Sequence, residues 1–249
     1  MFIKILYLTR IMKKYYLDVL TDKYSDFNGR ARRNEYWMWT LSVTIIFIFA
    51  MIMDNLLGLN FEISMKSFFQ TNPKCAEKLY NKVVEYVLED KSKVDNTVVM
   101  DLFCGTGTIG QIVASKSENA KIVGVDIVAS AIEDAEKNAK RNNIEGLKFY
   151  AADVGKFLAA HPEYENKIKT IILDPARAGI APKTLQKIIN LKADRMVYVS
   201  CNPATQARDT EELRNHGYEL KKISLVDQFP HTSHIETVVL FEKIPVDTI

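Results

Sequence analysis

From residue 74 onward, short β-rich runs alternate with helical segments, and this alternation constrains the fold more than any other feature. Such an order is typical of an α/β domain in which a doubly wound, mostly parallel sheet carries helices on both faces. The last two β-rich runs have no helix between them, which predicts a closing hairpin with one antiparallel strand. We expect strands at 97–103, 121–126, 147–150, 169–173, 195–200, 220–227 and 236–241, and helices at 74–89, 109–115, 128–142, 182–191 and 205–215.

The first 60 residues have a different character. Residues 37–53 read WMWTLSVTIIFIFAMIM, an almost unbroken apolar run that follows three arginines at positions 30, 32 and 33. A helix needs about 20 apolar residues to cross a bilayer, and extending the run to residue 59 reaches that length. The pattern predicts a transmembrane helix at about 37–59, with a buried or interfacial helix as the alternative. We therefore divide the chain into an N-terminal segment, 1–60, and an α/β domain, 61–249.

Charge and cysteine content limit the partners that composition alone can indicate. The formal net charge is +2, so the chain as a whole does not have the strongly basic character of many nucleic-acid-binding proteins. Its three cysteines, Cys75, Cys104 and Cys201, are widely spaced and odd in number. This spacing suggests no disulfide framework and no metal-ligand pair, and we expect no metal and no iron–sulfur cluster.

A glycine-rich loop follows the first predicted strand and opens a helix. The string DLFCGTGTIG, residues 101–110, contains glycines that allow a tight turn and close approach of a ligand, although the motif alone is weakly specific. Asp101 ends the strand, where a carboxylate would repel pyrophosphate but attract the ammonium and sulfonium groups of S-adenosylmethionine. Asp126 ends the second strand and could bind both ribose hydroxyls, and Asp153 follows the third strand and could reach adenine. The alternative is that these aspartates only cap helices.

Four further strings converge on the same predicted edge of the sheet. They are SFFQTN (67–72), LDPARAG (173–179), YVSCNPATQARD (198–209) and DQFPHTSHIETV (227–238). In this order they resemble the uridine-C5 RNA methyltransferase family, whose members modify tRNA or rRNA, and the resemblance covers about residues 64–243. It implies a Rossmann-like class I methyltransferase fold, S-adenosyl-L-methionine as the cofactor and RNA as the substrate.

The family's chemistry requires a nucleophile and a base. A thiolate that adds to carbon 6 of uracil activates carbon 5 toward the methyl group, and a base then removes the carbon 5 proton. The resemblance assigns the nucleophile to Cys201, just before a proline turn, and the base to Glu236. A buried cysteine that only packs is the alternative for Cys201. Cys104 is a rival thiol, and the histidines at 231 and 234 are rival bases.

The resemblance also assigns residues that bind rather than react. It implies cofactor contacts from Gln70, Phe103, Gly105, Asp126, Asp153 and Asp174, and substrate contacts from Asp174, Arg177, Asn202 and His231.

The N-terminal segment carries a second resemblance. The string FNGRARRNEYW, followed by an apolar run, resembles the start of the DUF805 inner-membrane proteins over about residues 13–60. Members of the methyltransferase family carry β-rich and RNA-binding domains ahead of SFFQTN, and this segment stands in their place. We expect a cytoplasmic catalytic domain with possible membrane association through 37–59. The alternatives are a truncated or fused remnant that binds cofactor or RNA without turnover, and a membrane protein with a passenger methyltransferase domain.

Overall fold

A computed structural model describes residues 54–56, 59–61, 72–228, 232 and 235–244 of the chain. Within these ranges, strands and helices alternate as expected. The strands of the main sheet are β3 (Val98–Leu102), β4 (Lys121–Asp126), β5 (Leu147–Ala151), β6 (Ile168–Leu173), β7 (Arg195–Ser200), β8 (Tyr218–Val226) and β9 (Glu236–Lys243). The helices are α4 (Pro73–Leu88), α5 (Thr108–Lys116), α6 (Ala129–Arg141), α7 (Val154–Ala160), α8 (Pro182–Asn190) and α9 (Pro203–Asn215).

The seven strands form one sheet in the order β5-β4-β3-β6-β7-β9-β8. Neighbouring strands from β5 to β7 are parallel, whereas β9 runs antiparallel to both β7 and β8. The expected doubly wound sheet with an antiparallel final strand is therefore confirmed.

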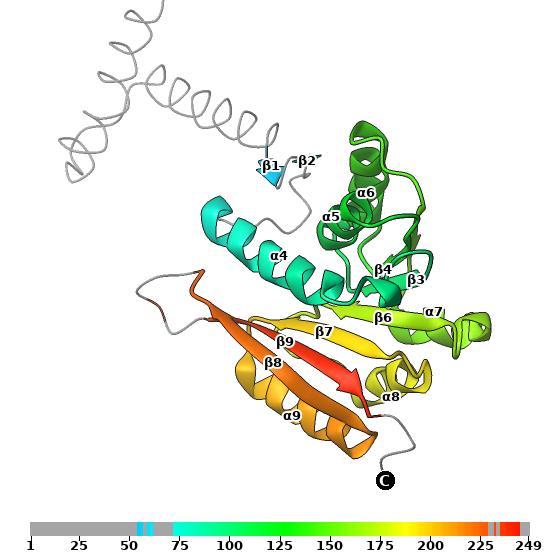
Figure 1. Cartoon of the computed structure of the whole chain (residues 1–249), viewed down its shortest axis with the longest axis vertical. Coiled ribbons are helices and arrows are strands. Elements are labelled where there is room, and N and C mark those ends of the chain that lie inside the picture. The colour runs from blue at the N-terminus through cyan, green and yellow to red at the C-terminus, as the bar shows by residue number, and fades with distance from the viewer. Residues whose placement is uncertain (1–53, 57–58, 62–71, 229–231, 233–234, 245–249) are drawn as a thin grey trace, which may run out of the picture. The chain divides into compact units, whose positions relative to one another are not determined.

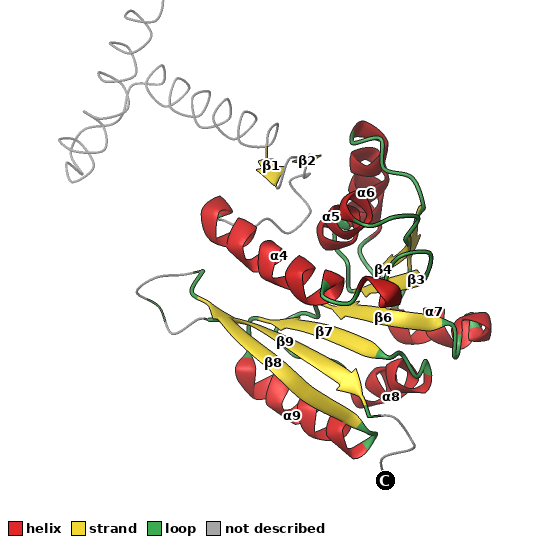
Figure 2. Ribbon diagram, viewed as in Figure 1, coloured by secondary structure: helices red, strands yellow, loops and turns green. Residues whose placement is uncertain are grey.

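Helices cover both faces of this sheet (Figure 2). Helices α4, α5 and α6 lie on one face, and α7, α8 and α9 lie on the other, so the central strands are buried on both sides. All six residues of β7 are buried, which explains why its sequence, RMVYVS, shows no polar alternation. The sheet thus has two apolar cores, one beneath each helical layer.

The topology brings the ends of distant strands to one edge. Parallel strands β3, β4, β6 and β7 all finish there, so the loops that follow them meet. Strand β9 is antiparallel and begins at the same edge, because Thr237 pairs with Ser200 at the end of β7. Residues that precede β9 can therefore join residues that follow the parallel strands.

The end of the expected membrane helix differs from the prediction. Residues Asp54–Leu56 (β1) and Leu59–Phe61 (β2) form an antiparallel hairpin, and Phe61 is buried in the core beside Leu79 and Val83 of α4. The prediction that a membrane helix continues to residue 59 is therefore wrong, because its last residues pair as strands. Residues 37–53 lie outside the described ranges. Among the described helices, none combines the length and the apolar character required to cross a bilayer.

Two other features are the domain division and a short helix after β5. The division at residues 60 and 61 stays a prediction. Helix α7, which the sequence analysis did not predict, has only seven residues, and so short a segment gives a weak periodic signal.

Candidate active site

One cavity of about 430 Å³ lies at the edge where the parallel strands end. It brings together seven of the residues that the sequence indicated, although they are spread over more than 130 positions. These are Phe103, Gly105, Asp126, Asp174, Arg177, Cys201 and Glu236.

The glycine-rich loop forms one wall of this cavity. Phe103 and Gly105 both adopt positive φ angles, +64° and +52°, and the amide of Gly105 donates a hydrogen bond of 2.9 Å to Oδ2 of Asp126. The other carboxylate oxygen of Asp126 accepts a bond of 2.8 Å from the amide of Val128. Asp126 is therefore oriented by the backbone on both sides. A Cβ at position 105 would meet no atom within 4 Å, so the loop leaves open space there.

Two further carboxyl groups, the buried Asp101 and the half-buried Asp174, line the same cavity. Oδ2 of Asp101 accepts a bond of 2.9 Å from the amide of Gly110, whereas its Oδ1 has no partner in the described structure. Burial raises the pKa of Asp101 to about 7. Burial, together with the charges of Glu236, Asp101 and Asp126, raises the pKa of Asp174 to about 8. The cavity is thus rich in carboxyl groups that a cationic ligand would stabilise in their charged form.

The candidate nucleophile lies in a turn that hydrogen bonds hold in shape. Oγ of Ser200 accepts a hydrogen bond of 3.0 Å from the amide of Asn202. Nδ2 of Asn202 donates a hydrogen bond of 3.1 Å to the carbonyl of Arg177. Asn202 also caps α9, where its Oδ1 accepts from Ala204. The turn after β7 is therefore tied to the loop after β6, so Cys201 and Arg177 line the same cavity.

The electrostatic surroundings of Cys201 oppose ionisation. Burial raises the pKa of its thiol, the charges of Glu236 and Asp174 raise it further, and Arg177 lowers it. The thiol therefore needs a change in these surroundings, or a proton acceptor, to become a thiolate.

The candidate base begins β9. Glu236 is 7% exposed, and burial raises the pKa of its carboxyl group. The next residue, Thr237, contacts the carbonyl of Ser200 at 3.0 Å and Oε1 of Gln206 at 2.6 Å. Nε2 of Gln206 in turn donates 3.0 Å to the carbonyl of Tyr198. These bonds fix the start of β9 against the end of β7, and they hold Glu236 and Cys201 at one edge.

Other expected residues lie elsewhere. Asp153 is the N-cap of α7, where its Oδ1 accepts a bond of 2.9 Å from the amide of Lys156, and it does not line the cavity. Capping, the alternative considered for this aspartate, is thus present. Asn202 also does not line the cavity, but its hydrogen bonds hold the turn that carries Cys201. Gln70 and His231 fall outside the described residues, as does the rival base at position 234.

The sequence analysis missed Tyr80, which lines the cavity from α4. Tyr80 lies beside the apolar stripe of this helix, so periodicity assigns it to packing. Its contribution to the cavity depends on how α4 crosses the sheet, and local sequence carries no signal for that. Cys104, the rival thiol, also lines the cavity, and burial beside Asp101 and Asp126 raises its pKa well above the ordinary value.

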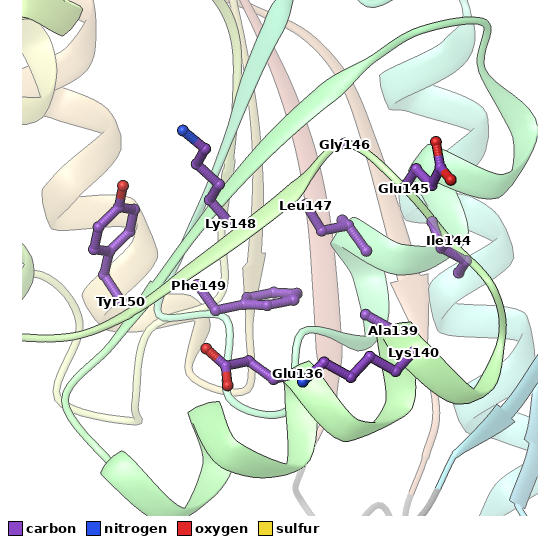
Figure 3. Close-up of a pocket in the computed structure, with 10 residues that line it drawn as sticks. All are labelled: Glu136, Ala139, Lys140, Ile144, Glu145, Gly146, Leu147, Lys148, Phe149 and Tyr150. Atoms are coloured by element: carbon purple, nitrogen blue, oxygen red, sulfur yellow. The ribbon is translucent and has the colours of Figure 1, made fainter.

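A second cavity, of about 590 Å³, lies between α6 and the edge strand β5 (Figure 3). Its walls include Ala139, Lys140, Gly146, Leu147 and Phe149, so it includes the start of β5 and the last turns of α6. This cavity shares no lining residue with the cavity that contains Asp126. None of the residues with expected chemistry lines this cavity, and we assign it no catalytic role. In the described part of the chain, no group of His, Cys, Asp and Glu side chains is arranged to hold a metal ion.

The fold and the cavity together define a class of protein. A doubly wound sheet with a reversed final strand, a glycine-rich loop after β3 and an acid at the end of β4 are the features of a class I methyltransferase. A family model described as a methyltransferase domain matches residues 93–237, and the chain belongs to this family. A second model, described as a protein of unknown function (DUF805), matches residues 24–84.

Two curated relatives of this chain are named as RNA methyltransferases. The chain is 46% identical over 192 residues to an uncharacterized RNA methyltransferase of Clostridium acetobutylicum, which covers 77% of this chain and 40% of that protein. It is 46% identical over 188 residues to a second uncharacterized RNA methyltransferase, from Clostridium tetani. This match covers 76% of this chain and 39% of that protein. The chain thus spans about two fifths of the length of these curated relatives.

Solved structures agree with this placement. The tRNA (uracil-54, C5)-methyltransferase of Pyrococcus abyssi, solved with S-adenosyl-L-homocysteine, is 33% identical with a TM-score of 0.61, covering 76% of this chain and 44% of that one. A magnesium protoporphyrin IX methyltransferase of Synechocystis is 16% identical with a TM-score of 0.52, over 71% of this chain and 86% of that one, and it shares the fold alone. The expected resemblance to uridine-C5 RNA methyltransferases is therefore confirmed.

Proposed function

We propose that this chain transfers a methyl group from S-adenosylmethionine to carbon 5 of a uridine in tRNA or rRNA. The observation that carries the proposal is the meeting of three groups in one cavity. A thiol, Cys201, and a carboxyl group, Glu236, come from neighbouring strands and line the same cavity as the glycine-rich loop with Asp126. Methyl transfer to carbon 5 of uracil requires these groups together: a nucleophile, a base and a cofactor site.

The cavity's chemistry fits the cofactor. Gly105 leaves open space beside Asp126, whose oriented carboxylate suits the two ribose hydroxyls. The unpaired Oδ1 of Asp101 and the half-buried carboxyl group of Asp174 suit a cationic amino acid moiety, because a positive charge offsets the cost of ionising them. S-adenosylmethionine, when bound, supplies an electrophilic methyl group, and its ammonium and sulfonium groups match these carboxyl groups.

The chain's own residues then divide the reaction into two steps. In the first, Cys201 loses its proton to solvent and its thiolate sulfur bonds to carbon 6 of the uracil, the electrons of the carbon 5–carbon 6 double bond shift to make carbon 5 nucleophilic, and carbon 5 takes the methyl group. After methylation, Glu236 takes the proton from carbon 5, the sulfur–carbon 6 bond breaks and the thiolate leaves. Arg177 lies in the cavity where it favours the thiolate, since its charge lowers the pKa of Cys201. Because RNA and cofactor occur together in the cytoplasm, we place the catalytic domain there.

Methyl transfer to RNA tests this function directly. The full chain is incubated with isotope-labelled S-adenosylmethionine and total bacterial RNA, and the RNA is then digested to nucleosides. We expect the label in 5-methyluridine and its loss in Cys201→Ser, which keeps the size of the side chain but has a much weaker nucleophile. Label in another nucleoside, or equal label with Cys201→Ser, would overturn the proposal.

A further inference from the structure

Helix α4 carries a stripe of lysines that the catalytic chemistry does not use. Lys74, Lys78 and Lys82 lie four residues apart, so they follow one face of the helix at intervals of about 6 Å. Lys74 and Lys78 are exposed, and neither pairs with a carboxylate in the described structure. Lys82 is 34% exposed and pairs with Glu85. Two unpaired cations on one helical face are available to an anionic partner.

A groove of about 420 Å³ runs beside this stripe. Lys78 and Lys82 form its helical side, and residues Ser224 to Asp227, at the end of β8, form the other. Leu225 lies in this second wall and is 62% exposed, although it is a large apolar residue. Figure 1 shows α4 passing beside the end of β8, which is the last strand of the sheet on that side. The groove therefore combines cations with an exposed apolar surface.

The groove and the active-site cavity share the same helix. Tyr80 of α4 lines the cavity, whereas Lys78 and Lys82 line the groove, so the helix separates the two. Asn72, the N-cap of α4, donates a hydrogen bond of 3.3 Å to the carbonyl of Gln228, which follows the groove wall. The groove thus reaches the catalytic edge of the sheet at the first turns of α4.

Acidic groups limit where an anion can bind. Asp227 lies in the strand wall of the groove, and Glu77 is the neighbour of Lys78 in the helix. Glu85 already pairs with Lys82. A chain of phosphates therefore has its most favourable path along the outer side of α4, over Lys74 and Lys78, with bases turned toward Leu225.

We propose that this groove between α4 and the end of β8 binds the RNA backbone next to the target nucleotide. This inference rests on the proposed function, since it takes RNA as the substrate. Lysines bind phosphates without reading sequence, and exposed apolar side chains contact unstacked bases. The groove positions the strand while the target base enters the cavity on the other side of α4.

Salt-dependent RNA binding tests the proposal. A fluorescently labelled RNA hairpin with a uridine in its loop is titrated with the full chain at several salt concentrations, and binding is followed by anisotropy. The test variant carries Lys74→Glu and Lys78→Glu. The control carries Lys91→Glu and Lys116→Glu, an equal charge change at two exposed positions, one in the short 3-10 helix that follows α4 and one at the end of α5.

We expect the RNA affinity of the test variant to fall by about tenfold or more. The plot of log affinity against log salt should also become less steep, by about 1 to 1.5 in slope, because each phosphate contact in single strands contributes about 0.7 to that slope. The control should keep the wild-type slope, and both variants should bind S-adenosylmethionine normally by calorimetry. Equal losses in the two variants, or no loss in the test variant, would overturn the groove assignment. Methyl transfer to RNA by the wild-type chain, measured in parallel, decides the proposed function separately.

Discussion

At the scale of single residues, the carboxyl groups that line the cavity decide which kind of cofactor it can bind. Asp126 is held by two backbone amides, and Asp101, Asp174 and Glu236 are carboxyl groups whose pKa values burial raises. A cationic cofactor suits these surroundings, and an anionic one does not. The roles of Asp126 and Cys201 can therefore be tested by measurements on binding and ionisation.

Replacing Asp126 with alanine should weaken cofactor binding and leave the fold intact. In the proposed cofactor site the carboxylate accepts hydrogen bonds from the ribose hydroxyls, and hydrogen bonds to charged groups contribute about 1.5–3 kcal/mol each. We expect a loss of at least about tenfold in S-adenosylmethionine affinity by calorimetry, with Asp126→Asn intermediate. Circular dichroism and a thermal melt check that the domain remains folded. Unchanged affinity in Asp126→Ala would exclude the ribose assignment.

The thiol of Cys201 should ionise only at high pH in the free enzyme. Burial and the charges of Glu236 and Asp174 raise its pKa, so the thiolate fraction, and with it the alkylation rate, increases as pH rises through that value. Glu236→Gln removes one negative charge and should lower the pKa, whereas Arg177→Ala removes the opposing positive charge and should raise it. Iodoacetamide labelling of Cys201 across a pH series, followed by mass spectrometry, measures both shifts. Shifts in the opposite directions would contradict the charge arrangement.

At the scale of elements, strands β7 and β9 bring the two proposed catalytic groups together. Cys201 follows the end of β7 and Glu236 begins β9, and the bonds from Thr237 to Ser200 and Gln206 join the two strands at that point. The antiparallel direction of the last strand is thus the feature that brings the candidate base to the same edge of the sheet as the candidate nucleophile.

Thr237→Val tests this link. Valine keeps the shape of threonine but removes the hydroxyl, and it leaves Oε1 of buried Gln206 without its partner. An unpaired buried polar group costs about 1–3 kcal/mol, so the free energy of unfolding should fall by that amount in a denaturant titration. The RNA methylation rate should fall more than S-adenosylmethionine affinity, because Glu236 is displaced and the glycine-rich loop is not. Thr210→Val, whose hydroxyl bonds only to a backbone carbonyl within α9, is the matched control.

At the scale of the whole molecule, the sequence predicted the sheet and most of the residues that line the cavity. It did not predict which helical residues also line the cavity. Phe103, Gly105 and Asp126 follow strand ends, and strand order alone brings such positions to one edge. Tyr80 enters the cavity only because α4 crosses strands more than a hundred residues away in sequence, which no local pattern encodes. The hairpin at Asp54–Phe61 was hidden for the same reason: its apolar residues suit a helix equally well until Phe61 meets the core.

In the proposed mechanism, Cys201 forms a covalent adduct with uracil and Glu236 releases it. Variants that lack one group or the other should therefore stop the reaction at different steps. Glu236→Gln keeps the nucleophile and the cofactor site, so it should methylate once and then stall with RNA attached. Cys201→Ala should form no adduct, because the sulfur that bonds to carbon 6 is gone.

The most direct measurement is a denaturing gel of Glu236→Gln after incubation with excess RNA and methyl-labelled S-adenosylmethionine. We predict a protein–RNA conjugate that survives denaturation, carries the labelled methyl group and is absent from the double variant Cys201→Ala/Glu236→Gln. A conjugate that persists in the double variant would place the nucleophile elsewhere, with Cys104 as the next thiol in the cavity. Full turnover by Glu236→Gln, with free 5-methyluridine-containing RNA and no conjugate, would contradict the role of Glu236 as the base.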